Sequence, residues 1–396
     1  MNEPKIRFKG SDYNLSITTL GAITKEYKVS NMNVHHQNLL SLSYGKIIRK
    51  DINAKKGLLP ASFDTYQLVK ENIIVFRVTD LQNDKKSLRV AISKEEGIIS
   101  PAYVCIECVD ENVNPDYLFL LLHFYDVIKK VYYSMGDGMR QTLTYKDLKE
   151  LQIAYPNMDK QLEIVDYFKK FDSIIQSTTK KIESLKQVKA ASLQSMFPQE
   201  GETTPRVRFK GFEGEWEKVR ASNVFKTFNE KNRPDLPVLS ATQDRGMVTR
   251  ESIGYNIFHD KSNEATYKHI LPGQFIIHLR SFQGGFAHSS IEGIASPAYT
   301  IMEFKDKTRH FDLYWKYIFV SKEFIKRLEL ITYGIRDGRS ISFEEFSEMY
   351  FTVPSYEEQK KIASYITTLD RQINLQSQRL EKLKQIKAAC LDKMFV

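Results

Sequence analysis

Cysteine is scarce in this 396-residue sequence, and three cysteines are too few for a disulfide framework. No run of 18 apolar residues occurs, so the sequence predicts no membrane-spanning helix. The first residues show no apolar run behind a basic start, which a secretory signal would need. These absences favour a cytoplasmic protein. Hydrophobic residues make up 42% of the chain and charged residues 27%, which is typical of globular proteins with an ample core.

Motifs of enzyme active sites are also missing. The sequence has no Gly-x-x-x-x-Gly-Lys-[Ser/Thr] nucleotide loop, no Gly-x-Gly-x-x-Gly, no His-Glu-x-x-His and no Asn-Pro-Pro-[Tyr/Phe]. Cys105 and Cys108 have no second pair, so we interpret them as structural and predict no metal site. Glu-x-Lys pairs of the nuclease kind occur at 26–28 and 358–360. The first lacks an upstream acid, and Glu358 is better explained as a helix cap, so we expect no catalysis by this chain.

Basic residues outnumber acidic ones. The net charge is +9 and the pI is about 9.1. Such an excess favours a polyanionic partner, with nucleic acid first and an anionic membrane second. The alternative is that the charge is incidental, since many proteins are this basic without binding a polyanion.

The strongest internal signal is a repeat. Residues 156–197 align without a gap with residues 354–395, and 16 of the 42 aligned positions are identical. Both windows contain a Lys-Gln-[Val/Ile]-Lys-Ala-Ala run and end in Met-Phe. The chain is therefore a tandem duplication in which each half ends in this conserved segment.

Each repeated window predicts one long helix. Apolar residues recur at alternating spacings of three and four, which is the heptad seam of a coiled coil. The seam residues are Phe168, Phe171, Ile175, Ile182 and Leu185 in the first copy and Ile366, Leu369, Ile373, Leu380 and Leu383 in the second. Thr178 and Gln376 fill the remaining seam position and predict one polar layer. Ser355 with Glu358 predicts a capping box, whereas the first copy has Asn157 as a cap but Lys160 in place of the glutamate.

The duplication supplies both partners of a coiled coil within one chain. We therefore predict intramolecular antiparallel pairing, with the two globular regions at opposite ends and related by a pseudo-twofold axis. About 35 residues at 1.5 Å each make a rod of roughly 50 Å, which exceeds one DNA turn of roughly 34 Å. The alternative is pairing between two chains, which would make a dimer.

The regions between the helices share a mixed α and β pattern, so the predicted fold class is α+β. We predict domains at 1–155 and 206–353, long helices at 156–197 and 354–396, and a linker at 198–205. In the first domain the pattern predicts strands and a helix at 68–78, 97–106 and 116–133. The counterparts in the second domain are a turn and strand at 272–277 and a helical stretch at 313–330.

These features together resemble the specificity subunit of type I restriction–modification systems. The resemblance rests on Pro354-x-x-x-Glu358-Gln359-x-x-Ile362 and its weaker copy Pro156-x-x-x-x-Gln161-x-x-Ile164. It rests also on Ser-Pro-Ala-Tyr at 100–103 and 296–299, on glycine-and-arginine loops before each helix, and on Arg-Phe-x-Gly-Phe-x-Gly-x-Trp at 208–216. The first half departs from the pattern because no tryptophan matches Trp216, which makes the start of that domain the less certain one.

The resemblance implies a function without catalysis by this chain. Each globular region would be a target recognition domain that reads one half of a split sequence in double-stranded DNA. The paired helices would set the spacing and dock two adenine-methyltransferase subunits, which bring S-adenosylmethionine. Restriction subunits driven by ATP and Mg²⁺ would join that core. The alternative is a basic coiled-coil scaffold protein without sequence-specific DNA binding.

Candidate DNA contacts are polar residues in loops beside predicted strands. Arginine and lysine read guanine, asparagine and glutamine read adenine, and basic residues also bind phosphate. In the first domain they are Tyr44, Lys46, Gln82, Asn83, Lys85, Lys86, Arg140 and Gln141. In the second they are Gln243, Arg245, Arg280, Ser281, Gln283, Arg336 and Arg339. Tyr44 and Lys46 are expected in the places of Gln243 and Arg245. For any single residue, the alternative is a solvated surface side chain.

Overall fold

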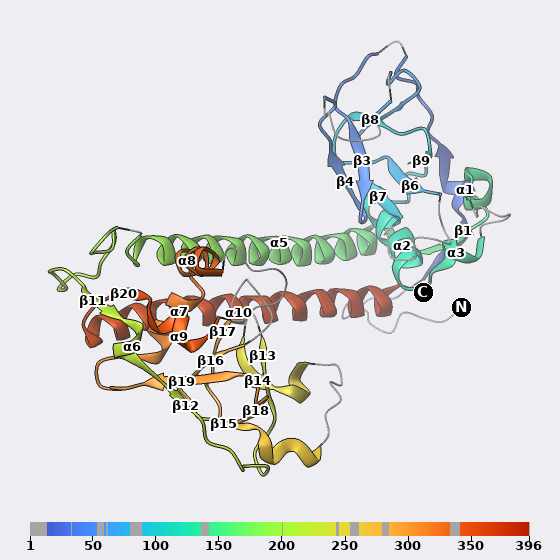
Figure 1. The fold of residues 1–396 in the computed structure, drawn as a ribbon. Helices are drawn as coiled ribbons and strands as arrows, with labels where there is room; N and C mark the ends of the chain where they lie inside the picture. Colours follow the sequence, from blue (N-terminus) through green and yellow to red (C-terminus); the bar gives the residue numbers. More distant parts are fainter. Residues whose placement is uncertain are drawn as a thin grey trace. The chain divides into compact units, whose positions relative to one another are not determined.

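The computed structural model describes residues 14–32, 34–53, 59–60, 62–79, 89–135, 142–199, 201–242, 245–253, 261–278, 285–332 and 341–395. The chain divides into two compact units (Figure 1). Unit 1 comprises Met1–Thr179 and Gln378–Val396, and unit 2 comprises Lys180–Ser377. Each unit thus contains one globular domain and parts of both long helices. The domain boundaries given above stay a prediction.

The domain of unit 1 is built on a four-stranded antiparallel sheet in the order β2-β9-β6-β7, with two-stranded pairs β1-β10, β3-β4 and β5-β8. Its elements are β1 (Ser16–Thr19), α1 (Leu20–Ile23), β2 (Thr24–Glu26), β3 (Leu40–Ser43), β4 (Lys46–Arg49), β5 (Gln67–Val69), β6 (Ile74–Arg77), β7 (Val90–Ile92), β8 (Gly97–Ile99), β9 (Tyr103–Cys108), α2 (Pro115–Val127), α3 (Val131–Met135), α4 (Tyr145–Leu148) and β10 (Gln152–Tyr155).

Unit 2 repeats this topology with β12-β19-β16-β17 and the pairs β11-β20, β13-β14 and β15-β18. Its elements are β11 (Glu217–Arg220), α6 (Ala221–Val224), β12 (Phe225–Phe228), β13 (Leu239–Thr242), β14 (Gly246–Thr249), 3-10 helices η1 (Arg250–Ile253) and η2 (Lys261–Thr266), β15 (Lys268–Ile270), β16 (Phe275–Ile277), β17 (Phe286–His288), β18 (Gly293–Ala295), β19 (Thr300–Phe304), α7 (Asp312–Phe319), α8 (Lys322–Thr332), α9 (Phe343–Ser347) and β20 (Tyr350–Val353). The α+β class and the tandem duplication are confirmed.

Several predicted elements were too long. The strand predicted at 68–78 is two strands, β5 and β6, which belong to different sheets. Asn72 between them has a φ of 68°, a turn conformation that asparagine tolerates. The helix predicted at 116–133 likewise breaks before Lys130, where φ is 55°, into α2 and α3. Apolar content predicted these segments well, but the backbone turns inside them depend on single residues.

The strand predicted at 97–106 and the helical stretch predicted at 313–330 also divide in two. Residues between β8 and β9 form a turn at Pro101, which cannot donate a ladder hydrogen bond. In the second case α7 ends before Val320, whose ψ of 0° is not helical, and α8 begins at Lys322.

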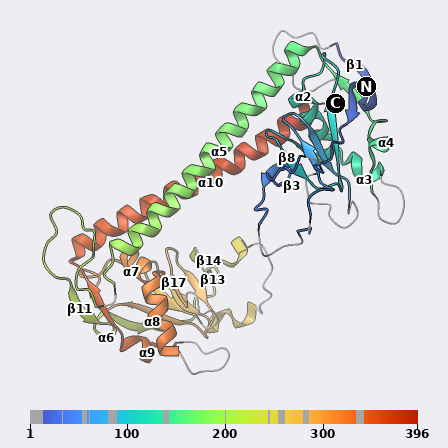
Figure 2. The ribbon, with the colours of Figure 1, turned by 90° about the horizontal axis from the view of Figure 1, so that it is seen from above.

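The long helices are α5 (Met158–Ser195) and α10 (Tyr356–Met394). In unit 1 the first part of α5 lies beside the last part of α10, and in unit 2 the rest of α5 lies beside the first part of α10 (Figures 1 and 2). Lys387 bonds Asp172 in unit 1 at 2.5 Å, and Lys189 bonds Asp370 in unit 2 at 2.5 Å. In unit 1 the Tyr167 hydroxyl also lies 3.5 Å from the Cys390 sulfur. Because Asp172, further along α5, meets Lys387, earlier in α10, the packing there is antiparallel.

The seam residues proposed from the heptad pattern are buried or half-buried in both helices. The predicted polar layer joins Thr178 of unit 1 to Gln376 of unit 2, so it concerns the relative placement of the two units and stays a prediction. Within α5, the Thr178 hydroxyl donates to the Ile174 carbonyl at 2.7 Å.

The repeated Met-Phe ends complete the two domain cores. In unit 2, Met196 and Phe197 at the end of α5 join the core, and the Phe197 ring stacks on Tyr314 with centroids 5.4 Å apart. In unit 1, Met394 and Phe395 at the end of α10 do the same, and Phe395 contacts the repeat-equivalent tyrosine, Tyr117, at 5.6 Å. Each long helix therefore starts at the domain of one unit, and the Met-Phe pair at its end packs in the domain core of the other unit. This explains why the duplication keeps both residues.

The pseudo-twofold relation concerns the relative placement of the two units and stays a prediction. None of the helices that the structure describes is long and apolar enough to cross a membrane.

Candidate nucleic-acid interface

The start of each long helix is joined to its own domain by a buried glutamine. In unit 1, Gln161 donates from Nε2 to the carbonyls of Asn112 and Pro156, both at 2.8 Å. Its Oε1 accepts the backbone N–H of Asn114, the N-cap of α2, at 2.8 Å. All three bonds go to backbone groups, and the bond to Pro156 is buried. The amide thus fixes the angle at which α5 leaves the domain.

Gln359 repeats this arrangement in unit 2. Its Nε2 donates to the carbonyls of Arg309 and Pro354 at 3.0 Å each, and its Oε1 accepts the backbone N–H of Phe311, the N-cap of α7, at 2.9 Å. Both glutamines are at most 1% exposed. The sequence carried the signal for these residues, because they are identical in the two repeats.

An ion pair strengthens the start of α10. Both carboxylate oxygens of Glu358 accept from the Arg208 guanidinium, at 2.7 Å and 2.8 Å. This pair raises the pKa of Arg208. The capping box predicted for Ser355 and Glu358 is therefore only half formed. The Ser355 hydroxyl accepts the N–H of Glu358 at 3.4 Å, but the carboxylate turns to Arg208 because a bidentate charged partner binds it more strongly than one backbone N–H.

The first copy has the weaker arrangement that its sequence predicts. Asn157 accepts the N–H of Lys160 at 3.1 Å, and Lys160 pairs with Glu163 along the helix at 2.9 Å. Within the described part of unit 1, the start of α5 therefore has a lysine bonded to a half-exposed glutamate where α10 has the buried Glu358–Arg208 pair.

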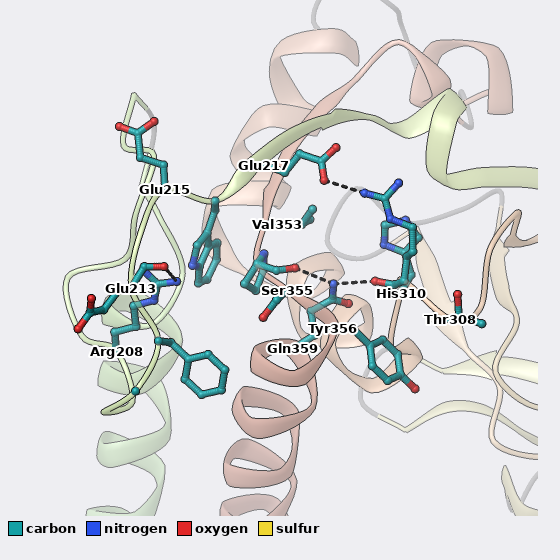
Figure 3. Close-up of a pocket in the computed structure, with 15 residues that line it drawn as sticks. Arg208, Glu213, Glu215, Glu217, Thr308, His310, Val353, Ser355, Tyr356 and Gln359 are labelled. Carbon is teal, nitrogen blue, oxygen red and sulfur yellow. Dashed lines mark hydrogen bonds and ion pairs between the residues drawn. The ribbon is translucent and has the colours of Figure 1, made fainter.

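A cavity of about 440 Å³ lies where α10 joins the domain of unit 2 (Figure 3). Trp216, Tyr356 and the glutamine at the helix start line it, together with the segment before β11. Two ion pairs lie in its wall, because Arg309 bonds Glu217 at 2.9 Å in addition to the Arg208–Glu358 pair. Burial lowers the pKa of His310 to about 4, with a further contribution from Arg309, so this imidazole is neutral at pH 7. These pairs hold the helix start against the domain of unit 2.

Two of the predicted DNA contacts lie on the β3–β4 hairpin of unit 1. Ser43 pairs with Lys46 across this hairpin, and Tyr44 with Gly45 forms the two-residue turn between them. Both turn residues have positive φ, 45° and 73°, as a type I′ turn requires. Lys46 is exposed and has no acidic partner among the residues that the structure describes.

The corresponding hairpin of unit 2 is one residue longer. Thr242 pairs with Gly246, so three residues separate the strands, and only Arg245 of them is described. Gly246 has a φ of 73°, and a Cβ there would lie 2.3 Å from the carbonyl oxygen of His288. The expected equivalence of Lys46 with Arg245 is therefore wrong by one position. In strand register Lys46 matches Gly246, because the two loops differ in length.

The other candidates lie outside the described residues. Gln82, Asn83, Lys85 and Lys86 belong to the connection between β6 and β7, and Arg280, Ser281 and Gln283 to the equivalent connection between β16 and β17. Gln243 belongs to the β13–β14 loop, Arg140 and Gln141 to the α3–α4 connection, and Arg336 and Arg339 to the α8–α9 connection. Their contact with DNA stays a prediction.

A buried pair that the sequence did not indicate anchors the β6–β7 connection. Arg89 is 1% exposed and donates from Nη1 to the carbonyl of Thr79 at 2.7 Å, so it ties one end of the connection to the other. Its N–H donates to the carboxylate of Asp126 in α2 at 2.5 Å. Burial raises the pKa of Asp126. Arg89 sits in a polar stretch that predicts only a loop, and nothing in that pattern marks it as buried.

Histidine, cysteine and acidic side chains were compared with metal-ligand geometry over the part of the chain that the structure describes. Its residues include no group of three or more histidine, cysteine or acidic side chains that could hold a metal ion. Burial raises the pKa of the Cys105 thiol to about 12, so that side chain is an inert core residue.

Comparison with known proteins places the chain in one family. The sequence model of the type I restriction modification DNA specificity domain matches residues 28–187 and 213–385, which is most of the chain. No curated protein sequence gives a significant match.

Solved structures share the fold across the whole chain. The S subunit of a type I restriction-modification system from M. genitalium is 14% identical, with a TM-score of 0.60 over 100% of this chain and 99% of that chain. A structure described for complex assembly and conformational transition of the type I R-M system is 17% identical, with a TM-score of 0.51 over 97% and 99%. The HsdS subunit from Thermoanaerobacter tengcongensis is 16% identical, with a TM-score of 0.48 over 96% of each chain.

Proposed function

This chain belongs to the type I restriction–modification DNA specificity family, and from that premise we propose that it is the non-catalytic subunit that selects the DNA target of a type I complex. Each domain reads one half of a split sequence in double-stranded DNA. The observation that carries this proposal is the pair of domains with one topology and different hairpin tips. A shared frame with divergent tips suits two reading surfaces for two different half-sites.

The long helices suit a spacer. Their 38 and 39 residues correspond to roughly 57 Å of helix at 1.5 Å per residue, which exceeds one DNA turn. Antiparallel ion pairs and the two glutamine joints fix each helix where it meets a domain. A spacer needs this stiffness, because the gap between half-sites must be held to within one base pair.

Exposed apolar residues on both helices suit the docking of methyltransferase subunits. They are Leu162, Ile174 and Ile386 in unit 1 and Val188, Tyr365 and Leu375 in unit 2, each between 36% and 52% exposed. We place the protein contact at these exposed side chains. We assign this contact to two adenine-methyltransferase subunits. S-adenosylmethionine, ATP and Mg²⁺ are then bound by partner subunits, and restriction subunits join the same complex in the cytoplasm.

The decisive experiment is methylation mapping of cells that express this chain with a matching methyltransferase subunit. The expected result is one split motif with adenine methylated in both halves. Cells with the methyltransferase alone are the control. A complex that assembles but methylates without any sequence preference contradicts the proposed function.

DNA binding by the assembled complex is expected to weaken steeply with salt, with a log–log slope of several units, because basic side chains release counterions from phosphates. A basic scaffold without specific DNA binding predicts the same affinity for every duplex. Equal affinity for target and scrambled duplexes would therefore favour the scaffold alternative.

Docking is tested by Ile174→Asp and Leu375→Asp, which place a charge in each exposed apolar set. Co-purification of the methyltransferase is expected to fall by at least tenfold. Ile17→Asp is the matched control, because Ile17 is 57% exposed on β1 and lies outside both helices. A loss of partner binding in Ile17→Asp of the same size contradicts docking on the helices.

A further inference from the structure

Tyr44 combines a left-handed backbone with a side chain that is mostly exposed. It is the first residue of the β3–β4 turn, its φ is 45°, and it is 72% exposed. No aromatic ring, cation or hydrogen-bond partner contacts it among the residues that the structure describes. It is the most exposed of the large hydrophobic residues in those ranges.

This position favours other residue types. Type I′ turns need positive φ at both central residues, which asparagine, aspartate and glycine adopt readily and a tyrosine adopts at a steric cost. The second turn residue, Gly45, fits the requirement with a φ of 73°. A tyrosine at the first position gains no burial in the free chain that would offset its cost. Its benefit must therefore come from a contact that forms in a complex.

The surroundings of Tyr44 favour nucleic acid as that partner. The hairpin from residue 39 to residue 50 contains Lys46, Arg49 and Lys50 and no acidic residue. Of these, Arg49 pairs with Glu95, while Lys46 stands beside Tyr44 on the strand that leaves the turn. An exposed ring with a lysine two residues away that has no acidic partner among the described residues suits a base step beside a phosphate backbone.

We propose that Tyr44 inserts as a wedge at one base-pair step of the half-site read by the first domain. This inference rests on the proposed function and adds a mode of reading. Pyrimidine–purine steps unstack most easily, so the first domain recognises its half-site partly through the deformability of such a step. The β13–β14 hairpin of unit 2, residues 239–249, contains no aromatic residue. The second domain therefore reads without a wedge at this place.

The test uses the assembled complex of full-length chain and methyltransferase on its mapped target duplex. 2-Aminopurine replaces one base at a time along both half-sites, and its fluorescence reports unstacking. With the native chain, one step in the first half-site is expected to brighten on binding. Tyr44→Ala is expected to abolish that signal and to weaken target binding roughly tenfold to a hundredfold, the range that loss of one stacked base gives.

Tyr44→Asn distinguishes loss of the inserted ring from loss of hairpin stability. Asparagine followed by glycine is the favoured pair for a type I′ turn, so the Tm of the free chain is expected to stay equal or rise while target binding falls as in Tyr44→Ala. Tyr350→Ala is the matched control, because Tyr350 is a half-exposed tyrosine on β20 of unit 2. With Tyr350→Ala, the 2-aminopurine fluorescence in the first half-site should match that measured with the native chain.

The outcomes distinguish the inference from its premise. Brightening at one step that Tyr44→Ala and Tyr44→Asn both remove supports the wedge. A native complex that reads its target while both variants bind and fluoresce as the native chain does overturns the wedge alone. Loss of methyltransferase binding in Tyr44→Asn assigns the ring to a protein contact and also overturns the wedge. A native complex without sequence preference overturns both the wedge and the proposed function.

Discussion

The N-terminal ends of the two long helices share one device and differ in another. Gln161 and Gln359 make the same three hydrogen bonds to backbone groups. Among the residues that the structure describes, only α10 adds a buried ion pair at its start, between Arg208 and Glu358. Backbone partners are present whatever the neighbouring sequence is, so a joint built on them survives divergence of the domain. A joint between two side chains survives only while both residues are kept.

The largest expected effect tests whether the Met-Phe ends are equivalent. Phe395→Ala removes a ring that contacts Tyr117, Phe124 and Phe168. The variant is expected to lose about 3–5 kcal/mol in unit 1. Amide hydrogen exchange should show lower protection in α2 and little change in α7. Phe197→Ala is the matched variant and should reverse the pattern, whereas an equal loss in α2 and α7 from either change would remove the distinction between the two cores.

The buried ion pair at the start of α10 gives the next effect. Arg208→Met leaves the carboxylate of Glu358, 1% exposed, without its cation and should cost about 3 kcal/mol in chemical denaturation. The matched variant in unit 1 is Lys160→Met, which breaks only a partly exposed pair and should cost less than about 1 kcal/mol. Equal costs would mean that the starts of α5 and α10 do not differ in stability.

The shared glutamine joint should give equal, smaller effects. Gln161→Leu and Gln359→Leu each remove three hydrogen bonds and leave a part-buried backbone N–H without its acceptor, at about 1–3 kcal/mol each. Urea denaturation of both variants measures this cost. Gln194→Leu, at an exposed position near the end of α5, is the control and should change little. A cost in only one of the two joints would show that their geometry is shared but their energetics are not.

The smallest effect concerns acid stability of unit 1. Burial raises the pKa of Asp116, but hydrogen bonds from Lys169 and Lys94 outweigh burial and hold that pKa below its usual range. A carboxyl with a lowered folded pKa contributes stability above about pH 4, and that stability is lost as the pH falls through the folded pKa. Lys169→Met should raise the Asp116 pKa in an NMR titration and cost less than about 1 kcal/mol at pH 7. The control is Asp312 in the first turn of α7, where burial raises the pKa but a hydrogen bond from His288 outweighs it, and this lowered pKa should not move.

Local periodicity foretold the elements better than their ends. Heptad spacing predicted both long helices because each seam position depends on neighbours three and four residues away. The strands near residue 70 were merged because Asn72 reverses the chain within an apolar run. The hairpin tips were recognised as candidate contacts, but their alignment slipped by one residue because the two loops differ in length.

The sequence likewise predicted some residues of the candidate interface and missed others. The sequence of the loop was enough to predict Tyr44 and Lys46 as DNA contacts. It could not predict the unfavourable positive φ of Tyr44, because the register of the flanking strands sets that angle. Arg89 could not be named at all, since its burial depends on Asp126, 37 residues away in α2.

The sequence by itself determined the duplication, the two long helices and the glutamine at each helix start, because repeats and heptads are local patterns. Only the tertiary structure decided the antiparallel register, the use of each Met-Phe end in the other unit's core and the capture of Glu358 by Arg208. These depend on residues far apart in the chain, 150 positions in the case of that ion pair. Such contacts form where packing brings two distant segments together, so the spacing of residues within one segment cannot predict them.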